Sequence, residues 1–400
     1  MKKALVVSCL FPPRGGVGVL RIAKFCKYLP EHGWQPVVLA ADAPEGAWRD
    51  EGLLAEVEAS SVIVRVPRPP DGSKQAFPEE SIRWRKPALA QALRLIREEG
   101  AAAIFSSGDP VVNHLVAGEA ARRSGHPWLA DFRDEWAVNP EFIRSVSQRA
   151  RANRWERDIL NKADRVVSVT APVVEMLARK GGGPAEKYSL IPNGYDGADL
   201  STLPPAPARR DRFTITFTGH LPNPADLLPV LNALRLLLSL RLARANELVL
   251  RLVGDFEHIR YDEAMGLSGL VQKIPPGAHR AALAWQQDSD LLLSVNDALR
   301  GRYAVSVKLY EYMASGRPVL AVAPAGSVIA DYVARSRTGR AADPGRPEDI
   351  ADAIAYFFAR WKRGENSVEP DRAFLEPFDR RRTAGQLARL LDSLAGAEPV

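Results

Sequence analysis

The chain has 400 residues, of which 46% are hydrophobic, and a formal net charge of +6. Single hydrophobic cores stop growing at about 250–300 residues, so this length predicts two domains. The mild positive charge favours anionic ligands such as nucleotide diphosphates or phospholipid surfaces. The sequence lacks a zinc-finger, helix-turn-helix or aromatic RNA-binding signature, which argues against nucleic acid. Cys9 and Cys26 are the only cysteines, which excludes a disulfide framework and favours a reducing compartment.

The N-terminus combines Lys2 and Lys3 with an apolar run that ends at Pro12-Pro13. This run is too short for a signal peptide, so we expect a first parallel β-strand. No stretch approaches the roughly 20 apolar residues that a membrane-spanning helix needs. We therefore expect a cytoplasmic protein and leave open a peripheral contact with the anionic inner face of the cell membrane.

Short apolar runs alternate with helical patterns through the first half of the chain. Strands are expected over 4–8, 36–40, 62–66, 103–106, 128–130, 165–170 and 188–191, with helices over 17–32, 87–98, 111–124, 144–165 and 172–180. This alternation predicts a doubly wound parallel sheet. Two segments without clear periodicity, 43–60 and 67–85, are expected to be loops that carry binding residues.

A Pro-rich polar segment over 198–212 predicts a linker, after which a second series of elements begins. Strands are expected over 214–218, 248–253, 271–274, 291–295 and 319–323, with helices over 225–244, 278–284 and 308–315. The pattern predicts an α/β protein with two Rossmann-like domains, residues 1–197 and 213–370, facing a central cleft. A last helix within 371–400 is expected to cross back to the first domain.

Two strand-end loops of the first domain carry candidate site residues. Gly15 and Gly16 open a helix, where glycine lets backbone amides approach an anion closely, although a plain strand-to-helix turn is an equal alternative. Asp131, Arg133 and Asp134 cluster directly after an apolar strand. We predict that these three side chains act in catalysis; a solvated loop with an internal ion pair is the alternative.

The second domain has its candidate residues at the end of its first strand and near 306–320. Gly219 and His220 follow the strand over 214–218. Lys308 and Glu311 stand three residues apart at the start of a short helix, which places a cation and a carboxylate on one face beside free N–H groups. Such a helix start is suited to a sugar nucleotide.

The segment from Ser306 to Leu320 resembles the donor-binding motif of retaining glycosyltransferase family 4, and Ile191-Pro192-Asn193-Gly194 resembles the turn that closes the family's first domain. The resemblance runs from Phe11 to about Trp361. It implies a GT-B fold and a metal-independent hexosyltransferase that moves a sugar from a nucleoside-diphosphate sugar to an acceptor hydroxyl with retention. Glu311 would bind the nucleotide ribose, and Gly15 and Gly16 would approach the donor phosphate and the acceptor.

Three features depart from the family's pattern. The family's Arg and Lys that hold the donor diphosphate are out of register after Gly219, so His220, Arg302 and Lys308 are the candidate replacements. Tyr303 stands where the first Glu of the family's paired glutamates would be. Arg133 occupies the usual histidine position, as it does in a branch of the family that acts on bacterial polysaccharide and natural-product acceptors.

The remaining patterns predict no metal and no cofactor besides the co-substrate. Asp288-Ser289-Asp290 could hold a cation, but its position before an apolar strand favours a helix-to-strand connection. The Arg-rich stretch over 144–165 is interpreted as a solvated helix face. The alternative is a helix that touches anionic lipid while a lipid-linked acceptor enters the site. Two alternatives stay open: a sugar-nucleotide 2-epimerase of the same fold, and a non-catalytic nucleotide-sugar-binding or scaffold protein.

Overall fold

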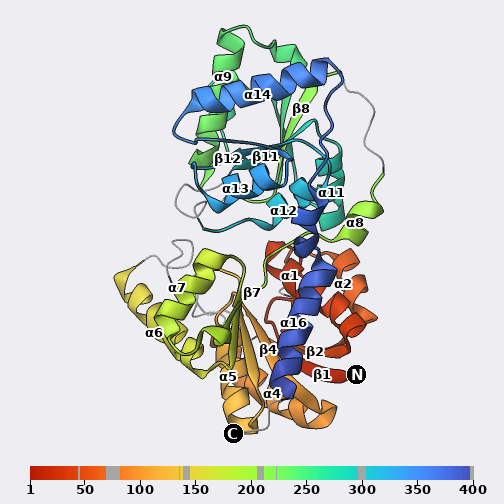
Figure 1. Cartoon of the computed structure of the whole chain (residues 1–400), viewed down its shortest axis with the longest axis vertical. Helices are drawn as coiled ribbons and strands as arrows, with labels where there is room; N and C mark the ends of the chain where they lie inside the picture. The colour runs from red at the N-terminus through yellow and green to blue at the C-terminus, as the bar shows by residue number, and fades with distance from the viewer. Residues whose placement is uncertain are drawn as a thin grey trace. The chain divides into compact units, whose positions relative to one another are not determined.

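The computed structural model describes residues 1–43, 46–68, 82–134, 136–137, 145–204, 211–221, 223–295 and 303–396. The chain divides into two compact units. Met1–Asn193 and Arg380–Val400 form the N-terminal unit, and Gly194–Asp379 form the C-terminal unit. Each unit is a parallel sheet with interleaved helices (Figure 1), which confirms the predicted α/β fold class. None of the described helices combines the length and the apolar character needed to cross a membrane.

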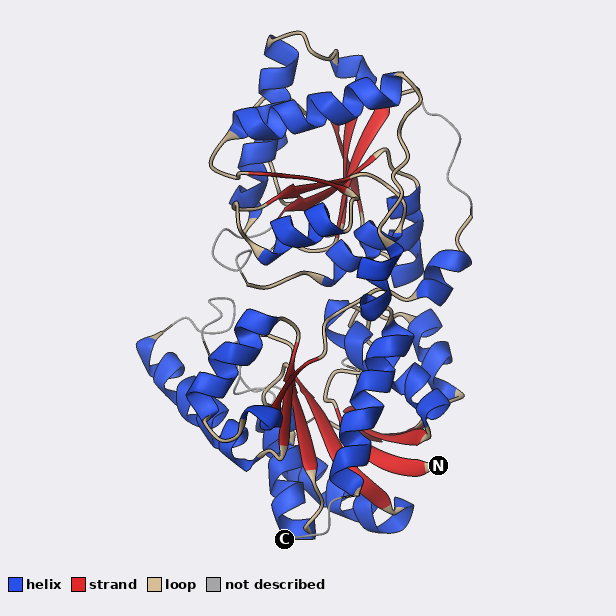
Figure 2. Ribbon diagram, viewed as in Figure 1, coloured by secondary structure: helices blue, strands red, loops and turns tan. Residues whose placement is uncertain are grey.

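The N-terminal unit contains a seven-stranded parallel sheet of order β3-β2-β1-β4-β5-β6-β7. Its strands are β1 (Lys2–Val7), β2 (Trp34–Ala41), β3 (Val62–Val66), β4 (Ala101–Gly108), β5 (Trp128–Phe132), β6 (Arg165–Ser168) and β7 (Tyr188–Leu190). Its helices are α1 (Val17–Tyr28), α2 (Glu51–Glu58), α4 (Arg85–Glu99), α5 (Val112–Ser124), α6 (Val146–Lys162), α7 (Ala171–Gly181) and α16 (Arg380–Ala395). The middle of each central strand is apolar and buried because helices cover both faces of the sheet (Figure 2), and the polar side chains Ser106, Ser107 and Asp131 lie toward the carboxyl ends of β4 and β5.

Helix α16 comes from the end of the chain and packs against α1 within the N-terminal unit (Figure 1). Lys2 Nζ lies 2.9 Å from Asp392 Oδ1, and Trp34 Nε1 donates to the same oxygen at 3.2 Å. The structure starts this helix at Arg380, whereas the sequence pattern placed the terminal segment at 371 and its helix at 376. The unit boundary lies after Asn193, four residues before the predicted end of the first domain.

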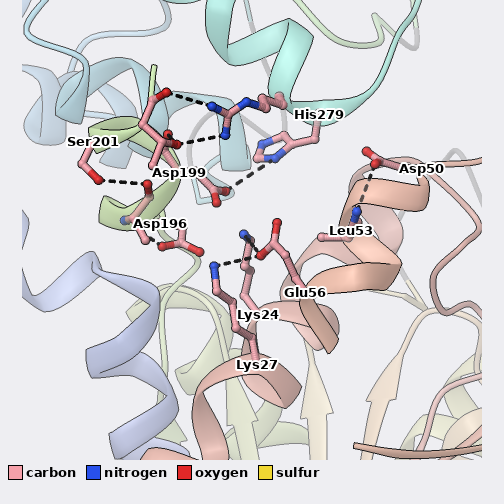
Figure 3. Close-up of polar contacts among 12 residues, drawn as sticks. Lys24, Lys27, Asp50, Leu53, Glu56, Asp196, Asp199, Ser201 and His279 are labelled. Carbon is pink, nitrogen blue, oxygen red and sulfur yellow. Dashed lines mark hydrogen bonds and ion pairs between the residues drawn. The ribbon is translucent and has the colours of Figure 1, made fainter. Parts of the chain in front are cut away.

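The segment over 43–60, which we expected to be a loop, contains helix α2, so that structural expectation was wrong. The expected binding role of the segment stays a prediction. Asp50 caps the helix by accepting a hydrogen bond from the Leu53 N–H at 3.1 Å. Lys24 and Lys27 of α1 both reach Glu56 of α2, at 2.6 and 2.8 Å (Figure 3). These contacts tie α2 to α1. Most of the second expected loop, over 67–85, lies outside the described residues.

The C-terminal unit contains a six-stranded parallel sheet of order β10-β9-β8-β11-β12-β13. Its strands are β8 (Phe213–Thr218), β9 (Leu248–Val253), β10 (Val271–Ile274), β11 (Leu291–Val295), β12 (Val319–Val322) and β13 (Gly339–Ala342). Its helices are α8 (Gly197–Ser201), α9 (Leu228–Ser239), α10 (Tyr261–Ala264), α11 (His279–Gln287), α12 (Val307–Ala314), α13 (Val328–Arg335), α14 (Pro347–Lys362) and α15 (Arg372–Leu375).

Strand β11 shows how this sheet builds two cores. Leu291, Leu293 and Val295 join a cluster with side chains of α9 and α14, while Leu292 joins a second cluster with side chains of α12 and α13. Successive side chains of a strand point to opposite faces, so a strand covered on both sides is apolar along most of its length. The helices on the two faces are visible in Figure 2. Helix α12, which carries two of the candidate site residues, is thus fixed on one face.

Several elements of the C-terminal unit differ from the sequence expectations. The expected helix over 225–244 is a 3-10 turn followed by α9, which ends at Ser239 near Arg241, a residue with a positive φ of 55°. The expected linker begins with the short helix α8 rather than with irregular chain. Strand β13 and helices α13 and α14 had not been predicted.

Candidate functional site

Two glycines pack closely at the carboxyl ends of β8 and β9 in the C-terminal unit. Gly219 has φ 106°, and its N–H donates to the Val253 carbonyl at 2.8 Å. A Cβ added to Gly254, whose φ is 151°, would lie 2.2 Å from the Gly219 carbonyl oxygen. A side chain at Gly254 would therefore collide with the first turn, so the tight pair depends on glycine. The turn leaves Gly219 exposed at the sheet edge.

Lys308, in the first turn of α12, reaches this glycine turn. Its Nζ lies 3.6 Å from the centroid of the Phe217 ring, and a Cβ added to Gly219 would lie 3.5 Å from Nζ. Burial lowers the pKa of Lys308 from 10.5 to about 7, against the opposing effect of the Glu311 charge. The side chain as a whole keeps partial exposure. An anion next to the glycine turn would therefore meet an amine that can take up a proton.

Glu311, one turn further along α12, is 5% exposed, and both of its carboxylate oxygens have partners on α11. His279 Nε2 lies 2.7 Å from Oε1, and Gln286 Nε2 donates to Oε2 at 3.0 Å. Asp199 of α8 faces the other ring nitrogen of His279 at 3.8 Å (Figure 3). The carboxylate is thus held in one orientation.

The same network continues to the end of β8. The Thr218 N–H donates to the Tyr312 hydroxyl at 2.9 Å, and Gln286 Nε2 lies 3.3 Å from Thr218 Oγ1. Burial raises the pKa of the Tyr312 hydroxyl, so it stays protonated and available for hydrogen bonding. Strand β8, helix α11 and helix α12 are therefore connected through side chains next to Glu311.

The structure brings together three of the predicted donor-binding residues, Gly219, Lys308 and Glu311. His220 follows Gly219 with an exposed side chain, and Arg302 lies outside the described residues. Sequence reasoning missed His279 and Gln286. Their spacing of seven residues, two turns of one helix, places them on the same face of α11 and was the available signal.

In the N-terminal unit, the ring of Trp48 covers the predicted glycine loop. The Gly15 N–H donates to the Trp48 carbonyl at 2.9 Å, and a Cβ added to Gly15 would lie 2.8 Å from Cδ2 of the indole. Gly16, with φ 106°, directly precedes α1. The close contact of this loop is with Trp48 of the same unit. The donor-binding role of Gly15 and Gly16 stays a prediction.

Asp131, at the end of β5, is fully buried and is held by side chains of the same unit. Arg21 Nη2 lies 2.9 Å from Oδ1 and its Nε lies 3.0 Å from Oδ2, while the Ser107 hydroxyl donates to Oδ2 at 2.7 Å. Arg21 also donates to the carbonyl of Pro192 at 2.9 Å. Asp131 therefore connects β4, β5, α1 and the turn after β7. These contacts are structural ones, and its predicted catalytic role stays untested.

Arg133 turns toward the backbone of its own unit. Its Nη2 donates to the Asp109 carbonyl at 2.7 Å and its Nη1 donates to the Gly18 carbonyl, while Nε lies 3.7 Å from Asp134 Oδ2. The Arg133 side chain is only 10% exposed, whereas the Asp134 side chain is 31% exposed. Of the three predicted catalytic residues, Asp134 is the most accessible to solvent.

The acidic pair considered for a cation takes part in contacts within the C-terminal unit. Asp288 Oδ2 lies 3.0 Å from Arg251 Nη1. Asp290 Oδ2 accepts from the Thr214 N–H at 2.9 Å, and its Oδ1 accepts from the Asn366 amide at 3.1 Å. The pair lies between α11 and β11, as expected for a helix-to-strand connection.

Two sequence families match the two halves of the chain. Residues 15–194 match the glycosyl transferase 4-like domain, and residues 212–360 match glycosyl transferases group 1. Together these matches cover most of the chain, and the second one includes Gly219, Gly254, His279, Gln286, Lys308 and Glu311. A glycosyltransferase of the GT-B type is the class that the fold and the family matches define. The chain belongs to the family 4-like glycosyltransferases.

Solved structures with the same fold are distant in sequence. The chain is similar to sucrose-phosphate synthase from Thermosynechococcus elongatus, with 17% identity, a TM-score of 0.70 and 100% of both chains covered. It is also similar to Anabaena HepE in complex with UDP and glucose, with 18% identity, a TM-score of 0.67, and coverage of 98% of this chain and 100% of that one. A putative UDP-N-acetylglucosamine 2-epimerase from Listeria monocytogenes shares 13% identity, with a TM-score of 0.63 and coverage of 98% and 96%. None of the curated proteins matches the sequence.

Proposed function

We propose that the protein transfers a hexose from a nucleoside-diphosphate sugar to an acceptor hydroxyl, with retention at the anomeric carbon and without a metal ion. The observation that carries the proposal is the group formed by Gly219, Lys308 and Glu311. The group combines an accessible backbone turn, a cation and an oriented carboxylate within one unit. These match the phosphate and ribose parts of a nucleotide sugar.

In this proposal Glu311 accepts hydrogen bonds from the ribose hydroxyls, and Lys308 with the amides of the Gly219 turn stabilises the leaving diphosphate. Preorganised donors of this kind stabilise developing charge in the transition state. The positive charge on Lys308 takes the part that a metal ion plays in other sugar transferases. Retention would follow from attack on the same face as the leaving group, with the leaving phosphate accepting the acceptor proton.

Support for a nucleotide-sugar donor comes from the structural relative HepE, which was solved with UDP and glucose. Polysaccharide, lipid-linked and natural-product alcohols are the proposed acceptor classes, and a cytoplasmic location fits the two buried free cysteines. A peripheral contact with anionic membrane would accompany a lipid-linked acceptor.

A thermal-shift screen of nucleoside diphosphates and nucleotide sugars tests the donor site, with Glu311→Ala as the matched variant. A ligand at 100 times its dissociation constant contributes about 2.7 kcal/mol, which raises the melting temperature measurably. The proposal requires a shift with one nucleotide family that is reduced in Glu311→Ala. If no nucleotide shifts the wild-type protein, the donor site is not functional.

Product analysis separates transfer from the alternatives. With the donor identified, NMR of the sugar product reports the anomeric configuration, and inversion would contradict the retaining assignment. The 2-epimerase alternative gains support if the free nucleotide sugar changes configuration at C2 without an acceptor. The scaffold alternative gains support if nucleotide binds and neither reaction occurs. Full activity after chelation by EDTA is the result expected for a metal-independent enzyme.

A further inference from the structure

A small pocket in the N-terminal unit lies where β4 and β5 end and α5 begins, and the proposed function does not use it. Its walls include Gly108, His114, Phe132, Asp134 and Trp136. It is narrow enough to seat about one water-sized group. In parallel α/β sheets, ligands bind beyond the carboxyl ends of the strands, and this pocket lies at that edge.

His114 presents a nitrogen to this pocket. The residue is 2% exposed, and its ring stacks on Phe132 with the centroids 4.7 Å apart. Nδ1 lies 2.8 Å from the hydroxyl of Ser106, whereas Nε2 is buried and has no hydrogen-bond partner among the described residues. A Cβ added to Gly108 would lie 2.5 Å from Nε2, so any side chain at this position would collide with that atom.

The hydrogen bonds of Ser106 determine which ring nitrogen carries the proton. Trp128 Nε1 can only donate, and it donates to Ser106 Oγ at 2.8 Å. Ser106 is fully buried, and its hydroxyl proton has His114 Nδ1 as its acceptor in the described part of the chain. Nδ1 therefore accepts. Burial lowers the pKa of His114 to about 4, so the neutral ring holds its proton on Nε2.

We propose that this pocket is a subsite for one hydroxyl group of a sugar-like acceptor, whose oxygen accepts a hydrogen bond from His114 Nε2–H. This inference rests on the proposed function, because it assigns the acceptor chemistry of the same enzyme. Phe132 and Trp136 are buried and line the pocket with apolar surface, so the room beside His114 fits a single hydroxyl group and excludes the ring that carries it. A buried donor without a partner is unfavourable, and a seated hydroxyl removes that cost.

Two substitutions distinguish the role of His114 Nε2 from that of Nδ1. His114→Asn places an amide near the position of Nδ1 and removes the group at Nε2, whereas His114→Gln extends an amide N–H toward the position of Nε2. We expect His114→Asn to weaken binding of the acceptor roughly threefold to tenfold, the range for one neutral hydrogen bond. Binding by His114→Gln should stay closer to that of the wild type, and nucleoside diphosphate binding should be unchanged in both variants.

The assay uses the full chain with 15N-labelled histidine and methyl glycosides of glucose, galactose and mannose as probes. With six histidines in the sequence, the His114 resonances are assigned from their loss in His114→Gln. We expect an Nε2–H tautomer that persists between pH 6 and 8 and whose resonance shifts with at least one glycoside. Saturation-transfer NMR then compares the dissociation constants of that glycoside for the three proteins.

Three results would overturn the inference: an Nδ1–H tautomer, no response of the His114 resonance to any of the glycosides, or equal weakening in both variants together with a lower melting temperature. The last result would mean that His114 is a packing residue. The glycoside titration needs neither donor nor turnover. Failure of the nucleotide screen would therefore refute the proposed donor site, and the glycoside titration could still be interpreted.

Discussion

Replacing Lys308 by methionine should remove the pH dependence of nucleoside diphosphate binding above pH 7. Methionine keeps an unbranched side chain that can still lie on Phe217, but it removes the charge. A hydrogen bond to a charged group contributes about 1.5–3 kcal/mol, which corresponds to a roughly 10- to 150-fold weaker affinity at pH 7 or below. The loss should be smaller at pH 9.

The direction in which affinity changes with pH follows from the pKa of Lys308, which burial lowers to about 7 in the free protein. A bound diphosphate favours the charged amine and raises this pKa, so binding takes up a proton between pH 7 and the pKa of the complex. The affinity of the wild type should therefore fall as the pH rises above 7, by at most about tenfold per pH unit. Below pH 7 the amine is protonated in both states and contributes no pH dependence.

Isothermal titration calorimetry measures both effects. Titrations with UDP, GDP and ADP identify the ligand, and repeats from pH 6 to 9 in two buffers of different ionisation enthalpy give the number of protons taken up. Lys308→Met corrects for ionisation of the diphosphate itself. The reasoning fails if the affinity of the wild type is constant above pH 7, or if Lys308→Met shows the same proton uptake.

Four further changes test the contacts described above. Glu311→Gln should weaken nucleoside diphosphate binding about tenfold or more in calorimetry, because an amide provides one acceptor oxygen instead of two; unchanged affinity would separate Glu311 from the ribose. His279→Gln should bind nucleotide better than His279→Asn, because only the longer amide reaches the Nε2 position next to Glu311, and equal affinities would exclude this positioning role. Asp131→Asn should lower the free energy of unfolding by about 3–5 kcal/mol in urea titrations because it leaves Arg21 buried without its ionised partner, and a change under about 1 kcal/mol would contradict this. Gly254→Ala should lower the melting temperature and weaken nucleotide binding together, since the added methyl group meets the carbonyl of the neighbouring turn; a variant with normal affinity would show that the turn adapts.

Much of the donor side could be predicted from local sequence. A cation and a carboxylate three residues apart at a helix start share a face wherever that helix lies, and a glycine after a buried strand indicates a close backbone approach. The local pattern therefore indicated Lys308 and Glu311, and the family resemblance added Gly219. The alternation of apolar runs and helical patterns was sufficient for two parallel sheets, because strands covered on both faces form nearly continuous apolar runs.

The partners of these residues depended on tertiary structure. His279 and Gln286 contact Glu311 only because α11 and α12 pack on the same face of one sheet, although the residues stand 32 and 25 positions away in the chain. The buried Arg21 that holds Asp131 is 110 residues away from it. No local pattern specifies such pairs, because the packing of whole elements brings them together.

The sequence by itself determined the α/β class and the two-unit division, since periodicity and chain length carry that information. Tertiary structure alone decided the protonation state of individual side chains. Burial beside Phe217 lowers the pKa of Lys308, and the hydrogen bond from Ser106 leaves the proton of His114 on Nε2. Charge and tautomer depend on the atoms around a side chain, and the folded chain supplies those atoms from distant positions.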